Sequence, residues 1–324
     1  MRAAVIRELG VPPGLEEVPD PSPAAGEVLV EVLAAPLNPV DIAVGAGRFY
    51  GGHPELPFVP GNECVGRVAG SDELVWAYGS GLGAKRDGGL AELVAAREEA
   101  LYPVPEGADP ALAGALGIAG LAGWMPVSWR APVRQGETVL VLGATGTVGL
   151  VAVQGARLLG AGRVVAAGRS PEGLARAAEA GADATVRLDE DDLAAAFREA
   201  CGGEGANLVV DPLWGEPLQA AVEACAQGAR IVSLGQSAGP EATLTSAAVR
   251  GKQLEILGFR IEAAGHEVIE REYRRLVEHA FAGDVRVDVE QVPLEDVTDA
   301  WRRQSEGAGV KLVVVPSAPS SDAA

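Results

Sequence analysis

The segment from Val139 to Gly149 constrains the fold of this chain more than any other. Its sequence is Val-Leu-Val-Leu-Gly-Ala-Thr-Gly-Thr-Val-Gly, a short apolar run followed by glycines and then by a helical pattern over residues 148–159. A buried strand that turns sharply into a helix is typical of a βαβ unit in a parallel sheet. The sequence therefore predicts an α/β fold around this segment.

The same alternation of short apolar runs and helical patterns continues on both sides of the glycines. The expected strands are residues 138–142, 163–167, 184–188, 208–211 and 231–235, and the expected helices are 172–180, 193–201 and 218–226. We therefore predict a parallel-sheet domain over residues 116–259. Residues 1–115 have β-rich patterning broken by Pro and Gly, and residues 260–316 are expected to complete that domain. Residues 317–324 are expected to be a disordered polar tail.

Charge excludes several classes of partner. The chain has 26 Lys and Arg against 45 Asp and Glu, a net charge of −19. Nucleic acids and anionic membranes are held by clustered cations, so we expect neither as a partner. The three cysteines form no C-x-x-C pair and the three histidines lie far apart, so the residues predict no metal site. A reducing, cytoplasmic location fits this cysteine usage, and the N-terminus lacks the apolar run of a signal peptide.

One uncharged segment has the length of a membrane span. Residues 110–129 carry no charge, but they include Pro110, Pro126 and four glycines. A buried helix, or two helices joined by a bend, is the better interpretation of this composition.

The glycine turn predicts a dinucleotide site. Ala144 holds the first position of the G-x-G-x-x-G pattern, and Gly146 and Gly149 hold the second and third. Glycines let the backbone approach a pyrophosphate, and the following helix offers free N–H groups from Thr147 and Val148. The alternative is a tight turn that binds nothing.

The next strand is expected to select the nucleotide. Gly168, Arg169 and Ser170 lie about 20 residues beyond the turn, where an acidic residue would bind the 2′-hydroxyl of NAD. Arg169 and Ser170 instead suit a 2′-phosphate, so we favour NADPH. The alternative is that Arg169 is a solvated surface side chain.

With these residues in place, the chain resembles the medium-chain dehydrogenase/reductase superfamily, most closely its zinc-independent quinone oxidoreductase branch. The resemblance covers nearly the whole length. It is carried by Leu-Asn-Pro-Val-Asp at 37–41, Leu-Pro-Phe-Val-Pro-Gly-Asn-Glu at 56–63, Gly-Gly-Leu-Ala-Glu at 88–92, Ile-Val-Ser-Leu-Gly at 231–235 and Val-Lys-Leu-Val-Val-Val-Pro at 310–316. It implies a Rossmann doubly wound parallel sheet and a β-rich GroES-like catalytic domain, with the active site in the cleft between them.

The resemblance also implies roles for individual residues of this chain. Zinc-using members carry Cys and His-Glu at the positions of Asn38 and Asn62-Glu63, so no metal is expected here. Tyr50 is the candidate proton donor, Asn38 is expected on the nicotinamide side, and Asp41 is expected to brace that loop. Cofactor contacts are further expected from Leu234, Gly235, Gln236, Phe259 and Lys311. Relatives are commonly dimers, and residues 254–259 would be the joining edge strand.

Three functions remain open at this stage. The first is an NADPH-dependent reductase of a quinone or an α,β-unsaturated carbonyl. The second is an enoyl-thioester reductase in which Tyr50 donates the proton. The third is an NADPH-binding sensor without turnover. The sequence does not name the substrate, because fold alone does not determine chemistry.

Overall fold

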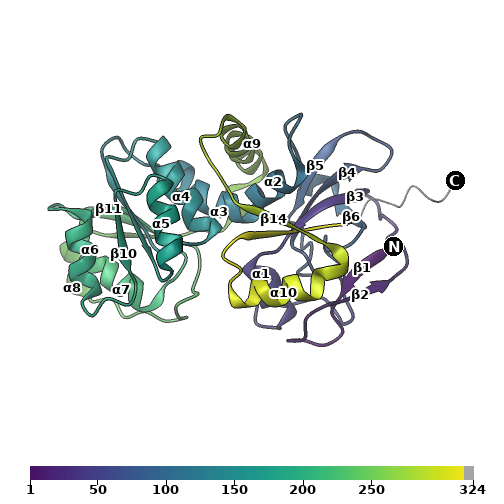
Figure 1. The fold of residues 1–324 in the computed structure, drawn as a ribbon, viewed down its shortest axis with the longest axis horizontal. Helices are drawn as coiled ribbons and strands as arrows, with labels where there is room; N and C mark the ends of the chain where they lie inside the picture. Colours follow the sequence, from purple (N-terminus) through teal and green to yellow (C-terminus); the bar gives the residue numbers. More distant parts are fainter. Residues whose placement is uncertain (317–324) are drawn as a thin grey trace. The chain divides into compact units, whose positions relative to one another are not determined.

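The computed structural model describes residues 1–316, so the predicted tail at 317–324 lies outside the described residues. The chain forms two compact units (Figure 1). The β-rich unit contains Met1–Ile118, His266–Glu278 and the residues from Asp288 onwards. The parallel-sheet unit contains Ala119–Gly265 and His279–Val287.

The parallel-sheet unit is built on six strands, β8 (Thr138–Val141), β9 (Arg163–Gly168), β10 (Ala184–Arg187), β11 (Ala206–Asp211), β12 (Cys225–Ser233) and β13 (Glu255–Gly258). Their order is β10-β9-β8-β11-β12-β13, and every neighbouring pair is parallel. The order reverses between β8 and β11, which is the Rossmann arrangement with its switch point beside the first strand. The predicted α/β doubly wound sheet is confirmed.

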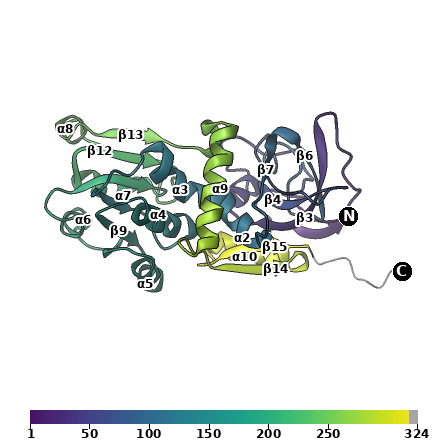
Figure 2. The same ribbon diagram turned by 90° about the horizontal axis from the view of Figure 1, so that it is seen from above.

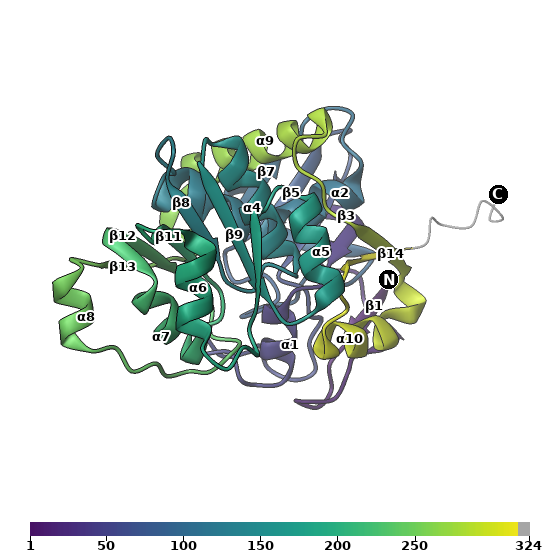
Figure 3. The ribbon, with the colours of Figure 1, turned by 60° about the vertical axis from the view of Figure 1, so that its left-hand side comes forward.

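Helices cover both faces of this sheet. They are α4 (Thr147–Leu158), α5 (Pro171–Glu179), α6 (Leu193–Cys201) and α7 (Gly215–Glu223), while α3 (Leu121–Met125) contacts α4 and α8 (Ser246–Gly251) contacts α7. Figure 3 shows α5 and α6 on opposite sides of β9. Phe197 of α6 and Leu218 of α7 are fully buried in one apolar cluster with strand residues such as Val165. The expected helix at 218–226 was too long, because Cys225 already pairs with Ala206 as the start of β12.

Strand β13 lies at one edge of the sheet. Within the described residues it pairs only with β12, and Ile256 on it is 39% exposed. An edge strand has unpaired backbone N–H and C=O groups. The predicted joining strand at 254–259 therefore coincides with an edge, and its pairing with a second copy stays a prediction.

The β-rich unit holds a seven-stranded sheet. Its strands are β3 (Glu27–Pro36), β4 (Glu63–Val68), β5 (Leu74–Tyr78), β6 (Leu93–Arg97), β7 (Leu101–Pro103), β14 (Val289–Pro293) and β15 (Lys311–Val315). The C-terminal strand β15 runs antiparallel to β3, with Val314 opposite Ala35 (Figure 2). Helices α1 (Pro39–Gly45), α2 (Pro110–Ala115) and α10 (Val297–Glu306) belong to the same unit, and α9 (His266–Ala282) contributes residues to both units.

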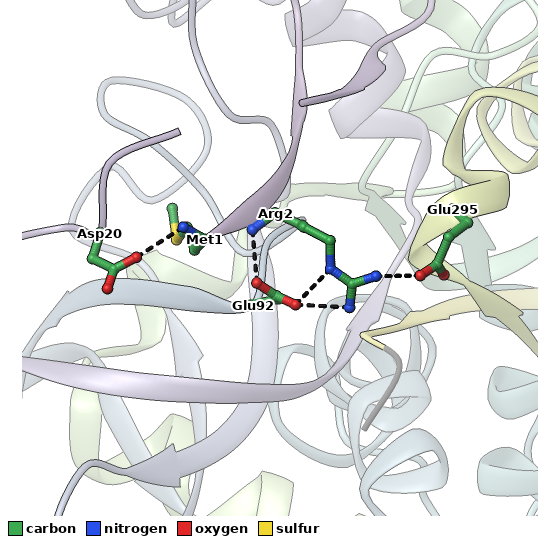
Figure 4. A network of polar contacts seen from close by, with 5 residues as sticks. All are labelled: Met1, Arg2, Asp20, Glu92 and Glu295. Carbon is green, nitrogen blue, oxygen red and sulfur yellow. Dashed lines mark hydrogen bonds and ion pairs between the residues drawn. The ribbon is translucent and has the colours of Figure 1, made fainter. Parts of the chain in front are cut away.

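An ion pair also joins the N-terminal hairpin to the C-terminal segment. The hairpin of β1 (Arg2–Val5) and β2 (Gly14–Glu17) begins the chain. The Arg2 guanidinium bonds both Glu92 and Glu295, and the Met1 ammonium donates to Asp20 (2.8 Å) (Figure 4). Because Glu295 belongs to the C-terminal segment, this contact helps that segment complete the β-rich unit.

The uncharged segment is a bent run of short helices. Pro110–Arg130 has the length and composition of a membrane span, but 78% of its most apolar window is buried in the protein. Its helical path breaks at Gly117 (ψ −115°), between α2 and α3. The predicted bend is therefore confirmed. A side chain at this position would also collide with its surroundings, since a Cβ on Gly117 would lie 2.1 Å from Oε2 of Glu63.

Candidate cofactor and active site

The glycine turn after β8 leaves open space on one side and packs tightly on the other. A Cβ added at Gly146 would meet nothing within 4 Å, whereas one at Gly149 would lie 2.4 Å from Cα of Ala144. The amide of Ala144 donates to the carbonyl oxygen of Ala167 (2.8 Å), which ties the turn to β9. The open side is what a pyrophosphate requires of the backbone, so these residues fit a dinucleotide.

Helix α4 begins directly after the open space. Gly146 is its N-cap, and Thr147, Val148 and Gly149 form its first turn. The first N–H groups of a helix have no partner within the helix, and they carry partial positive charge. Together with the space at Gly146, they can hold an anionic pyrophosphate.

Three further segments predicted to contact the cofactor reach the same edge of the sheet. Gly168 ends β9, Leu234 follows β12, and Phe259 follows β13, so all lie at the carboxyl ends of parallel strands. The Phe259 amide donates to the Ser233 carbonyl oxygen (2.9 Å). The structure thus brings together, on this edge, the predicted residues Gly146, Thr147, Val148, Gly149, Gly168, Arg169, Ser170, Leu234, Gly235, Gln236 and Phe259. Ligands of open α/β sheets bind at this edge.

Thr145 fills the space between the end of β9 and the start of α5. A Cβ on Gly168 would lie 2.3 Å from Cγ2 of Thr145, and a Cβ on Gly173 would lie 2.5 Å from its Cβ. Glycine is therefore required at both positions, because Thr145 occupies the space in which a Cβ would lie. Thr145 was not among the residues predicted from the sequence, although Gly168 and Gly173 near the end of β9 were a signal that could have indicated it.

A second cluster of predicted site residues lies inside the β-rich unit. Asn38, Asp41 and Lys311 are 4% exposed or less, and they meet Glu63, which is fully buried. The Lys311 ammonium donates to Oδ1 of Asn38 (2.6 Å) and to the Leu37 carbonyl oxygen (2.8 Å). Nδ2 of Asn38 donates to Oε1 of Glu63 (2.7 Å) and to a backbone carbonyl (3.3 Å). Asn38 thus joins a buried cation to a buried anion.

Each buried carboxylate in this cluster accepts three N–H groups. Oε2 of Glu63 accepts the Trp76 indole N–H (2.7 Å) and the Ile118 amide (2.8 Å), beside the Asn38 bond to Oε1. Asp41 accepts the Asn38 amide (2.7 Å) and both the amide (2.8 Å) and side-chain nitrogen (2.6 Å) of Asn62. These donors offset the desolvation of two ionised carboxylates only in part.

Burial shifts the titration of all three ionisable groups. It raises the pKa of Glu63 to about 7, against the opposing charge of Lys311 and the three N–H donors. It also raises the pKa of Asp41, which the Asn62 hydrogen bonds oppose. Burial lowers the pKa of Lys311, and the charges of Glu63 and Asp41 counter this. The cluster therefore balances desolvation against pairing.

The residues at the family's zinc positions do not fit a zinc ion. Asn38 and Asn62 are neutral amides whose side-chain nitrogens already donate to Glu63 and Asp41. The only other ligand atom offered by Asn38, Oδ1, is 2.6 Å from the Lys311 ammonium. A second cation there would meet that positive charge. Among residues 1–316, no group of three or more His, Cys, Asp or Glu side chains could hold a metal ion.

Tyr50 lies on a loop of the same unit. It is 77% exposed, and its ring contacts that of Phe49 with centroids 4.6 Å apart. The ring of Tyr50 is thus exposed, whereas Asn38 and Asp41 are buried. A phenol so exposed can meet a substrate from solvent.

Two families of known domains match this chain, one over the N-terminal part and one over the parallel-sheet part. Residues 24–106 match the alcohol dehydrogenase GroES-like domain family, and residues 147–280 match the zinc-binding dehydrogenase family. The chain is 29% identical over 317 residues to quinone oxidoreductase-like protein 2 of Bos taurus, covering 94% of the chain and 90% of the relative. It is 30% identical over 242 residues to quinone oxidoreductase of Rattus norvegicus, covering 72% and 73%.

Solved structures agree over almost the full length. The quinone oxidoreductase of Thermus thermophilus, solved with and without NADPH, superposes with a TM-score of 0.80 at 31% identity, covering 97% of this chain and all of that one. An NAD-dependent alcohol dehydrogenase superposes with a TM-score of 0.85 at 32% identity, covering 97% and 99%. The predicted resemblance is confirmed, and the two neighbours use different nicotinamide cofactors by their names.

The buried Glu63 predicts an inverted pH dependence of stability. Its pKa of about 7 in the fold exceeds the ordinary 4.5, so between these values the folded state keeps a proton that the unfolded state releases. The stability of the wild type should therefore fall by roughly 2–3 kcal/mol relative to Glu63→Gln as pH rises from 4.5 to 7. Thermal unfolding across this range measures it.

Two further measurements make this result specific. Glu106→Gln, at an exposed position, should give a curve parallel to that of the wild type. Trp76 emission should also titrate near pH 7 in the wild type but not in Glu63→Gln, because its indole donates to the carboxylate. Parallel curves for wild type and Glu63→Gln would contradict the assignment.

Proposed function

Because the chain belongs to the quinone oxidoreductase-like branch of the medium-chain dehydrogenase/reductase superfamily, we propose that it reduces a quinone or an α,β-unsaturated carbonyl with NADPH. Family membership makes it an NAD(P)-dependent oxidoreductase. The observation that carries the proposal is the carboxyl edge of the parallel sheet, with an open backbone at Gly146 and the exposed guanidinium of Arg169.

The chain's own residues would hold the cofactor in three places. The turn at Gly146 and the first N–H groups of α4 would receive the pyrophosphate. Arg169 would receive the 2′-phosphate, since it is exposed and has no hydrogen bond or ion pair within residues 1–316. Leu234, Gly235, Gln236 and Phe259 would lie along the remainder of the molecule. Bound NADPH would supply the hydride.

The buried cluster around Glu63 and Lys311 would hold the start of α1 in place rather than donate protons. Both N–H donors of Asn38 are used by protein acceptors, so its remaining capacity is one acceptor lone pair on Oδ1. We propose that Asn38 meets the nicotinamide side through this oxygen, with Asp41 bracing the start of α1. Lys311 donates two of its three ammonium N–H groups to Asn38 and Leu37 and is 4% exposed, so we propose that its role at the cofactor is exerted through Asn38.

The exposure of Tyr50 favours a second candidate function, an enoyl-thioester reductase. Reducing an enoyl thioester leaves charge on a carbonyl oxygen or carbon that needs a proton, and an exposed phenol can supply one. A quinone needs less of such a group, because its reduced oxygens exchange protons readily with water. Tyr50 would then only line the pocket.

A substrate panel tests the proposal. Purified protein with NADPH should lose the near-ultraviolet absorbance of the reduced cofactor when quinones or enones are added. Tight NADPH binding with no consumption across quinones, enones and enoyl thioesters would favour the sensor and overturn the reductase. Absence of binding to either nicotinamide cofactor would overturn the cofactor assignment as well.

Tyr50→Phe separates the two enzymatic candidates. If Tyr50 donates the proton, kcat on an enoyl thioester should fall about 100-fold, since general acid catalysis contributes on this order. If Tyr50 only lines the pocket, quinone reduction should change less than about threefold. Steady-state rates on both substrate classes measure this, with Tyr102→Phe as a buried tyrosine control whose rates should not separate the two classes.

Arg169→Asp should reverse the preference for the phosphorylated cofactor. Loss of the guanidinium and addition of a carboxylate should weaken NADPH binding by about 10- to 100-fold while NADH binding changes little. Fluorescence titration of both cofactors measures this. Arg134→Asp is the control, since Arg134 is exposed and precedes β8 at the opposite edge of the sheet. Unchanged NADPH affinity in Arg169→Asp would contradict the role of Arg169.

A further inference from the structure

Glu172 places a negative charge beside the residue expected to bind the 2′-phosphate. It lies in the first turn of α5, three positions beyond Arg169, and its side chain is exposed. Oε2 of Glu172 accepts the Ser170 hydroxyl (2.9 Å). Its own backbone N–H and the Ser170 bond lower the pKa of Glu172, so the carboxylate is ionised near neutral pH.

Ser170 is committed by the same contacts. Its hydroxyl hydrogen goes to Glu172, and its oxygen accepts the Gly173 amide (3.1 Å) as the N-cap of α5. A hydroxyl has one hydrogen to donate, so donation to a phosphate would require Ser170 to leave Glu172. The expected phosphate contact from Ser170 therefore competes with a contact already present in the protein.

Position 173 cannot carry a side chain that would bind the 2′-phosphate in place of Ser170. Thr145 occupies the space in which a Cβ of Gly173 would lie. A cation at that position, which would favour a 2′-phosphate, is therefore excluded while Thr145 is present. At the end of β9, recognition of the adenosine ribose is left to Arg169 and Glu172, which have opposite charges, with Arg176 one turn further along α5.

We propose that Glu172 is a specificity-determining residue that weakens the binding of NADPH relative to NADH and keeps the preference set by Arg169 small. This inference rests on the proposed cofactor. The physical basis is repulsion between a carboxylate and a 2′-phosphate carrying nearly two negative charges, a group that NADH lacks. Hydrogen bonding of Ser170 to Glu172 adds to it by withholding the hydroxyl.

Glu172→Gln tests the proposal with little change in shape. The variant removes the charge and leaves an oxygen that can still accept the Ser170 hydroxyl. NADPH should bind about five- to tenfold more tightly, and NADH should change less than about twofold. The gain should shrink in roughly 0.5 M salt, because salt screens exposed charges. Titration of both cofactors by fluorescence, at low and high salt, measures the effect.

Glu179→Gln is the matched control. It removes the same charge from the same helix, but at the last residue of α5, and it should change neither affinity by more than about twofold. An equal gain in Glu179→Gln would show a general effect of net charge and overturn the proposal.

Other outcomes are equally decisive. Unchanged NADPH binding in Glu172→Gln would overturn the role of Glu172 while leaving the cofactor proposal intact. Loss of NADH binding in the variant would show that Glu172 instead accepts the ribose hydroxyls, which also overturns it. Failure of the wild type to bind either cofactor would be a failure of the proposed function. Thermal unfolding of each variant confirms that it folds.

Discussion

Lys311 places one positive charge in the interior of the β-rich unit, and the polar groups around it are oriented by that charge. Its ammonium faces Oδ1 of Asn38, so the amide must point its nitrogen at Glu63. Rotating the amide would bring N–H groups against the ammonium and an oxygen against the carboxylate. A single buried cation thus determines the orientation of a side chain at the start of α1.

The same charge joins distant parts of the sequence. Lys311 begins β15, while Leu37 and Asn38 follow β3, 274 and 273 positions earlier. Separating β15 from β3 would leave Glu63 and Asp41 without the positive charge that opposes the effect of burial on their pKa values. The C-terminal segment is therefore an integral part of the β-rich unit. In the parallel-sheet unit, by contrast, the candidate site is made largely of backbone, and Arg169 and Glu172 after the end of β9 have exposed charged side chains.

The sequence was sufficient to predict those parts of the fold and site whose residues are adjacent in the chain. The strand, glycine turn and helix around Gly146 are adjacent in the chain, and the sheet edge follows from the alternation of strands and helices. Contacts between distant residues were not predictable in this way. The resemblance carried by residues 310–316 suggested a cofactor contact for Lys311, but the burial of this side chain depends on the pairing of β15 with β3. The packing of Thr145 against Gly173 likewise depends on how β9 and α5 meet the glycine turn. The roles of Tyr50, Asn38 and Asp41 stay predictions.

The packing of Thr145 against two glycines also constrains how this binding edge could evolve. A lysine introduced at position 173 while Thr145 remains would place its Cβ 2.5 Å from Cβ of Thr145, an atom that Thr145→Ala keeps, so only Thr145→Gly would remove this overlap. The two positions are therefore coupled: a side chain at position 173 is compatible with this packing only after the threonine side chain has been removed down to its Cα. Lineages that retain this threonine would have to change cofactor preference through the exposed charges of the neighbouring loop.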